Sequence, residues 1–147
     1  MRKALLVAAV LAVMAIPALA ADVGLIKVSK GNVQIERNGA KVAAPVGASV
    51  QASDVIMTGA DGSAGITFTD NSLVSVGPNT VFAIDKYRFD STTHAGEFEG
   101  SLKKGRLAAI SGKMVQASPE SMKIRTPSAI MGVRGTEFVV QVDEEKK

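Results

Sequence analysis

The 147-residue sequence contains no cysteine and no tryptophan, and it has only one tyrosine and one histidine. Without cysteine the chain has no disulfide scaffold, no thiolate nucleophile, no cysteine-based zinc site and no lipid-modified thiol. Hydrophobic residues make up 46% of the sequence and charged residues 21%, a balance that excludes disorder and collagen-like repeats. The length fits one domain with at most a short appendage.

A hydrophobic run lies close to the N-terminus. Arg2 and Lys3 precede apolar residues that end at Pro17, and alanines occupy both sides of the Ala20–Ala21 bond. This order of basic, apolar and small residues is typical of a cleaved secretory signal, although an uncleaved anchor is the alternative. The apolar run is shorter than the ~20 residues that a membrane-spanning helix needs. We expect residues 1–20 to be a signal peptide, and the chain to be periplasmic or secreted with no membrane span after cleavage.

The net charge of the expected mature chain is close to zero. The whole sequence has 17 basic and 14 acidic residues, and residues 1–20 contribute two of the basic ones and none of the acidic ones. Removing that segment lowers the formal net charge from +3 to +1. Long-range attraction to nucleic acid requires a sustained basic surface, so we expect no nucleic-acid partner.

Residues 21–142 show the two-residue periodicity of half-buried strands. Hydrophobic residues alternate with polar or small ones at Ile26 and Val28, at Val33 and Ile35, at Ala64, Ile66 and Phe68, at Met122 and Ile124, and at Phe138, Val140 and Val142. Turn-forming residues separate these runs at Asn38-Gly39, Asp61-Gly62, Asp70-Asn71, Gly77-Pro78-Asn79, Lys104-Gly105 and Ser111-Gly112. Short strands with regular turns predict an all-β fold, a compact roll or two-layer sandwich of many short, mainly antiparallel strands. Residues 113–121 are either a loop or a single helical turn.

The sequence offers little catalytic chemistry. His94, the single imidazole, lies in a polar stretch and is predicted to be a solvated loop residue rather than a ligand contact or a catalyst. The motif around Ser63 resembles G-x-S-x-G, but Asp61 replaces the first glycine and the strand–turn–helix context is missing. Asp54, Asp61 and Asp70 lie near turns, where aspartate bonds its own backbone, and their spacing does not match a calcium-binding loop. We therefore expect no enzyme activity, no metal and no cofactor.

A glycine-rich segment surrounds Arg134. Gly132 and Gly135 flank Val133-Arg134, between two strand-like runs, so tight turns would hold the guanidinium in a fixed position. A fixed guanidinium can bind a carboxylate in fork geometry. Two interpretations stay open: an internal clamp on the domain's own acid or carbonyls, and a contact to a partner or anionic ligand.

The ordered set of motifs resembles the FecR domain. The set comprises Gly31-x-Val33, Val46-Gly47, Asp54 to Gly59, Asp61 to Ser72, Val76 to Thr80, and Thr126-Pro127 followed by Arg134-Gly135-Thr136-Glu137-Phe138. The similarity extends roughly from Val23 to Val142. It implies an extracytoplasmic β-rich domain, which in the regulators that name the family relays the state of an outer-membrane transporter. It supplies no catalytic residues.

We therefore expect residues 21–142 to form a FecR-like binding module and residues 143–147 a charged tail. The expected partner is an envelope protein or a cell-wall component, in signalling or transport regulation, bound by surface complementarity or at a strand edge. Polar anchors are expected near Asp61, Asp70 and Arg134. The alternatives are a self-associating structural protein of the envelope and, third, an enzyme with a carboxylate-lined cleft.

Overall fold

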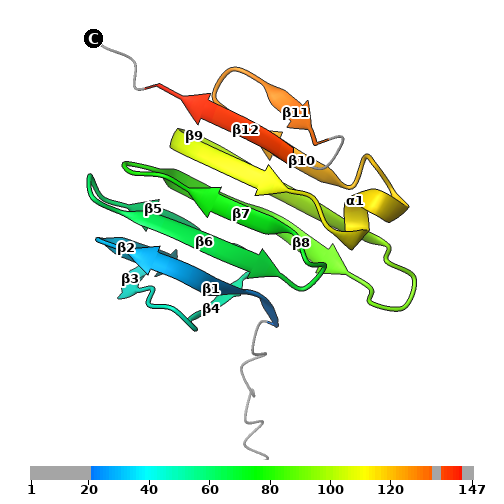
Figure 1. The fold of residues 1–147 in the computed structure, drawn as a ribbon, viewed down its shortest axis with the longest axis horizontal. Coiled ribbons are helices and arrows are strands. Elements are labelled where there is room, and N and C mark those ends of the chain that lie inside the picture. Colours follow the sequence, from blue (N-terminus) through cyan, green and yellow to red (C-terminus); the bar gives the residue numbers. More distant parts are fainter. Residues whose placement is uncertain (1–20, 134–136, 144–147) are drawn as a thin grey trace, which may run out of the picture.

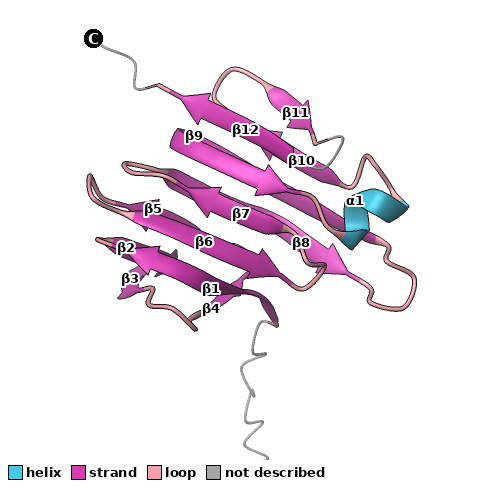
Figure 2. Ribbon diagram, in the orientation of Figure 1, coloured by secondary structure: helices cyan, strands magenta, loops and turns pink. Residues whose placement is uncertain are grey.

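The computed structural model describes residues 21–133 and 137–143 (Figure 1). Strands make up 60% of it and helix 4%, which confirms the all-β prediction (Figure 2). The described strands curl into two facing sheets, here called sheet A and sheet B. In Figure 1, sheet A lies toward the reader and sheet B is seen behind it.

Both sheets are assembled from segments that are distant in the sequence. In spatial order, sheet A contains β4 (Ser49–Gln51), β1 (Asp22–Lys30), β6 (Ser63–Phe68), β7 (Leu73–Val76), the second part of β9 (Gly96–Ile110) and β12 (Glu137–Val142). Sheet B contains β3 (Ala40–Ala43), β2 (Val33–Arg37), β5 (Val55–Thr58), β8 (Val81–Phe89), the first part of β9, β10 (Met122–Arg125) and β11 (Ile130–Gly132). Neighbouring strands are antiparallel, except that β10 runs parallel to β9.

The 15-residue strand β9 belongs to both sheets. Its first part pairs with β8 and β10, and its second part pairs with β7 and β12. The change of sheet occurs at Gly105, whose φ is +95°, and a Cβ there would lie 2.2 Å from Thr80 Oγ1. The predicted turn at Lys104-Gly105 is therefore wrong, because the strand bends at this glycine and continues.

The core fills the space between the sheets and follows the predicted alternation. Its largest fully buried side chains are Phe68, Phe82, Phe98, Ile26, Ile35, Ile56, Ile66, Ile84, Leu102, Leu107, Met114 and Met122. Phe68 contacts Phe98 at a centroid distance of 4.8 Å and Tyr87 at 5.3 Å. Since Phe68 belongs to sheet A and the other two rings to sheet B, this aromatic cluster joins the sheets.

One predicted core position is wrong. Val28 is 44% exposed, whereas Ile26 on the same strand is fully buried. The register of β1 against β6 shifts between these two residues, which marks a β-bulge at Lys27. A bulge adds one residue to the strand and moves the next side chain to the opposite face.

The most explicit turn signal and the unassigned segment both have clear structures. Asn38 and Gly39 have φ values of +53° and +79°, and they connect β2 to β3 as the predicted hairpin. Within residues 113–121 the structure has a single short helix, α1 (Lys113–Ala117), which buries Met114 and Val115. This helix corresponds to one of the two predicted alternatives.

Candidate interaction site

Asp70, one of the three predicted anchors, lies inside the protein. It is 1% exposed, and its carboxylate accepts hydrogen bonds from the Ser72 amide at 3.0 Å and the Ser72 hydroxyl at 2.7 Å. The Tyr87 hydroxyl lies 3.2 Å from the same carboxylate. The Asp70 carbonyl also accepts the Lys113 amide at the start of α1. Asp70 thus joins the β6–β7 turn to β8 and α1, and this burial leaves it almost no surface for a partner.

The phenol of Tyr87 interacts with the Asp70 carboxylate through a hydrogen bond and through its charge. Burial raises the pKa of its phenol to about 12, and the nearby charge of Asp70 acts in the same direction. The Tyr87 hydroxyl also lies 2.8 Å from Thr69 Oγ1 and accepts the Asp70 amide at 3.1 Å. The neutral phenol is therefore the form that this network stabilises.

Asp61, the second predicted anchor, is exposed in the loop between β5 and β6. Its carboxylate accepts the Asn32 amide at 3.2 Å, which ties this loop to the one between β1 and β2. Gly31 has a φ of +63°, and a Cβ there would lie 2.3 Å from the Asp61 carbonyl oxygen. Close packing of the two loops therefore requires glycine at position 31.

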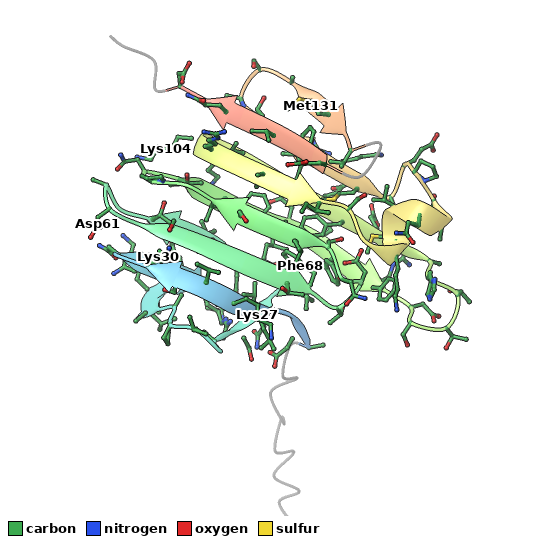
Figure 3. The ribbon with its side chains drawn as sticks, viewed as in Figure 1. Lys27, Lys30, Asp61, Phe68, Lys104 and Met131 are labelled. Carbon is green, nitrogen blue, oxygen red and sulfur yellow. The ribbon has the colours of Figure 1, made fainter. Side chains whose placement is uncertain are left out.

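The structure does not bring the predicted anchors together. Asp61 precedes β6 and Asp70 follows it, so the two lie at opposite ends of this strand; Figure 3 labels Asp61 at one end and Phe68 at the other. Arg134 lies outside the described residues. His94 is in the loop between β8 and β9, as predicted, with a φ of +59° and its ring stacked on Phe89 at a centroid distance of 6.0 Å.

Sequence reasoning missed an internal ion pair. Arg37 binds Asp54 in fork geometry, with Nε 2.9 Å from Oδ1 and Nη2 2.7 Å from Oδ2. Asp54 is 1% exposed and also accepts the Gln51 amide at 2.8 Å. The hydrogen bond to Asp54 raises the pKa of the Arg37 guanidinium, against the effect of burial. The pair fastens β2 to the turn before β5, and only the position of Asp54 near a turn was visible in the sequence.

A groove opens where the two sheets separate, between β12 and the β10–β11 hairpin. Its volume is about 820 Å³, and its lining includes Lys103, Lys104, Met131, Val139 and Val142. Lys104 on β9 and Met131 on β11 are labelled in Figure 3. The hairpin on its other side is closed by a turn in which the Thr126 amide bonds the Ala129 carbonyl at 2.8 Å. The lining also includes Asp143, so the groove combines an apolar wall with charges of both signs.

Strand β12 presents an unpaired edge beside this groove, because within the described part of the chain it pairs with β9 alone. On β9, the Arg106 amide donates to Thr80 Oγ1 and its carbonyl accepts the Gly77 amide, so both groups point away from β12. Gln141 is opposite Arg106, and its own amide and carbonyl consequently point outward from the sheet. The same holds two residues away, at Val139. Such an edge can accept a further strand.

Within residues 21–133 and 137–143, no three histidine, cysteine or acidic side chains gather closely enough to hold a metal ion. No helix in the same residues has the length and hydrophobicity needed to cross a bilayer.

These features define the class of the molecule: a two-sheet, all-β domain with an open strand edge and an adjoining groove. A family model described as "FecR protein" matches residues 54–147, more than half of the chain, and the chain belongs to the FecR family. FecR domains are extracytoplasmic and regulatory, take part in envelope signalling and are not a known enzyme family. No curated protein and no solved structure matches the chain.

The segment before the family match is part of the same fold. Strands β1 to β4 precede residue 54, yet β1 pairs with β6 and β2 pairs with β5. Each sheet therefore depends on strands from both sides of residue 54.

Proposed function

We propose that this protein is a non-enzymatic binding module of the cell envelope, which recognises a partner protein in signalling or transport regulation. Membership of the FecR family supports the setting. The observation that carries the binding mode is the open edge of β12, with outward backbone groups at Val139 and Gln141 beside the groove. A strand added there would gain backbone hydrogen bonds from the edge and side-chain contacts from the groove.

The proposal includes export and processing. Residues 1–20 act as a signal peptide that is cut between Ala20 and Ala21, residues 21–142 form the binding domain, and residues 143–147 form a charged tail. The first strand begins at Asp22 and the last ends at Val142, which supports these boundaries. No cofactor or metal takes part in the activity.

An extended segment of an envelope protein is favoured over a cell-wall polymer as the partner. The edge offers alternating amide and carbonyl groups, which a peptide backbone matches in spacing and polarity. Lys103 in the groove lining can pair with an acidic side chain of such a segment, and Asp143 can pair with a basic one. Asp61 lies on a different loop and contributes to the surface, whereas Asp70 acts by holding the fold. Arg134 remains a proposed anchor.

Strand addition at β12 can be tested by removing the backbone N–H of one residue that points away from β9. Gln141→Pro removes the N–H that points away from β9, so the pairing of β12 with β9 is kept while strand addition is blocked. Gln141→Ala is the matched control, because it removes the same exposed side chain and keeps the N–H.

The three proteins are expressed from the full-length sequence and used as bait in envelope extract of the producing cell, with captured proteins identified by mass spectrometry. We expect the unchanged protein and Gln141→Ala to capture the same envelope protein, and Gln141→Pro to lose at least about tenfold in affinity. Equal capture by both variants would refute strand addition, and no specific capture by the unchanged protein would refute the binding function.

A further inference from the structure

The outer faces of the two sheets differ in chemistry. On sheet B, Glu99 lies 3.9 Å from both Lys86 and Arg125, and Arg88 lies 4.0 Å from Glu97. These cross-strand pairs place charges of both signs on that face, where Lys86, Arg88 and Arg125 remain exposed and Glu99 is largely buried. Sheet B therefore has the character of an ordinary solvated surface.

Sheet A presents an apolar row instead. The register places Leu25, Thr67, Leu73 and Ile110 side by side on β1, β6, β7 and β9. Leu25 is 39% exposed, Leu73 42% and Ile110 45%. These three large aliphatic side chains form a ridge, defined here as Leu25, Leu73 and Ile110, in which Leu73 and Ile110 are neighbours and Thr67 separates Leu73 from Leu25. The ridge lies on the outer face of sheet A, the sheet nearer to the reader in Figure 1.

The next row of sheet A has small residues at its centre. Gly65, Ser75 and Ala108 are aligned on β6, β7 and β9, and the register continues to Val28 on β1 and Val139 on β12. Val28 lies beside Gly65, since a Cβ on Gly65 would be 3.3 Å from the Val28 Cβ. Both valines are exposed, at 44% and 51%. Because glycine has no side chain and those of serine and alanine are short, this small-residue row stands lower than the ridge, and the two valines bound it.

We propose that the outer face of sheet A binds a second copy of this chain. The two copies would be related by a two-fold axis that lies in the plane of the interface. The axis runs perpendicular to the strands, between the ridge and the small-residue row. This symmetry places the ridge of each copy on the small-residue row of the other. Leu73 then packs over Ser75 of the second copy, and Ile110 packs over Ala108. The face is thus complementary to itself in shape, as a two-fold contact requires.

The charges on this face and its area also support a second copy of the chain as the binding partner. The Lys30 and Arg106 positions follow the small-residue row on one side, and Glu137 is opposite Ile110 in the ridge row. The proposed axis reverses the strand direction, so Glu137 of each copy lies over Val139 of the other, one strand and one row away from Arg106. Five strands about 4.8 Å apart and about six residues long give roughly 1,000 Å² over both copies. This area is at the lower limit of specific interfaces, which fits a weak dimer.

The dimer goes beyond the proposed partner binding. It uses the outer face of sheet A, whereas partner binding uses the backbone edge of β12, and Val139 is the residue that belongs to both surfaces. The test is sedimentation velocity on the processed full-length product, over protein concentrations from about 10 µM to about 1 mM, where a weak dimer of this area is expected to form. We expect the sedimentation coefficient to rise with concentration, and Leu73→Lys to weaken the association at least about tenfold by burying an unpaired charge. Circular dichroism checks that each variant is folded.

Val42→Lys is the matched control, because Val42 is 48% exposed and lies on β3 of sheet B. It should associate like the unchanged protein. The proposal is overturned if the unchanged protein stays monomeric throughout, or if both lysine variants dissociate equally. A monomer that still captures its envelope protein would overturn the dimer and leave the proposed function intact.

Discussion

At the scale of single residues, the buried carboxylate of Asp70 holds a turn together. It accepts two hydrogen bonds from Ser72 and lies beside the Tyr87 hydroxyl. Asp70→Ala leaves these donors buried without their acceptor, and we expect a loss of about 2–4 kcal/mol in the free energy of unfolding. Urea denaturation at neutral pH measures the loss.

Asp61→Ala is the comparison for this change. Asp61 also accepts a backbone amide, from Asn32 at 3.2 Å, but this bond is exposed and water can replace it. The expected loss is about 0.5–1 kcal/mol. Equal losses for the two alanine variants would show that the burial of Asp70 does not matter to stability.

The single tyrosine allows a direct test of the same network by pH titration. The pKa of Tyr87 is raised to about 12, so its neutral form stabilises the fold fully below pH ~10 and this contribution is lost as the pH rises through about 12. With no tryptophan and no second tyrosine in the chain, tyrosinate absorbance reports on this residue alone. Asp70→Ala should lower the midpoint, because it removes a negative charge that disfavours tyrosinate. A midpoint near 10 in the unchanged protein would contradict the buried network.

At the scale of elements, β9 depends on one glycine to pass from sheet B to sheet A. Gly105 has a φ of +95°, and a Cβ there would be 2.2 Å from Thr80 Oγ1 and 2.5 Å from Thr80 Cα. Thr80 is fully buried and accepts the Arg106 amide, so it has little freedom to move. We expect Gly105→Ala to destabilise the protein by about 3 kcal/mol or more, through backbone strain and this overlap together.

Gly39→Ala separates strain from overlap. Gly39 has a similar φ of +79°, but nothing lies within 4 Å of the position a Cβ would take. The expected cost is about 1–2 kcal/mol, the penalty of a left-handed alanine alone. Urea midpoints of the two variants compare the costs directly, and a smaller loss at position 105 than at position 39 would exclude a close approach at Thr80.

The strands themselves were largely predictable, whereas their partners were not. Two-residue alternation depends on which side chains face the core, so it marked β6, β10 and β12 correctly. The parallel pairing of β9 with β10 depends on contacts between segments that no local pattern encodes. Glycine serves equally in a turn and in a bend of a strand, so the sequence around Gly105 does not distinguish the two.

The same limit applies to the candidate site. Asp61 and Asp70 have similar local sequences, but Asp70 is buried because Tyr87, 17 residues away, packs against it. Arg37 and Asp54 are also 17 residues apart, and nothing in either neighbourhood marks them as a pair. The open edge of β12 cannot be predicted from local sequence either, because it depends on which strands pair with β9 and on which side of β9 each one lies.

At the scale of the whole molecule, the two candidate surfaces can act at the same time. The β12 edge faces outward within the plane of sheet A, while the ridge and small-residue row lie on the flat of that sheet. A dimer formed through the flat face would therefore leave both β12 edges open to envelope partners. Such an arrangement would double the binding sites of the assembly and raise its avidity for a clustered partner.

The shared strand β9 also predicts that the protein unfolds as one unit. Sheet A cannot separate from sheet B without breaking β9, and the cluster of Phe68, Phe98 and Tyr87 joins the sheets through the core. Urea unfolding followed by Tyr87 fluorescence, which reports on the aromatic cluster between the sheets, should coincide with unfolding followed by far-ultraviolet circular dichroism, which reports on the strands of both sheets. If the dichroism signal falls in two steps and the fluorescence follows only one of them, the sheets are separate folding units and β9 is not the element that couples them.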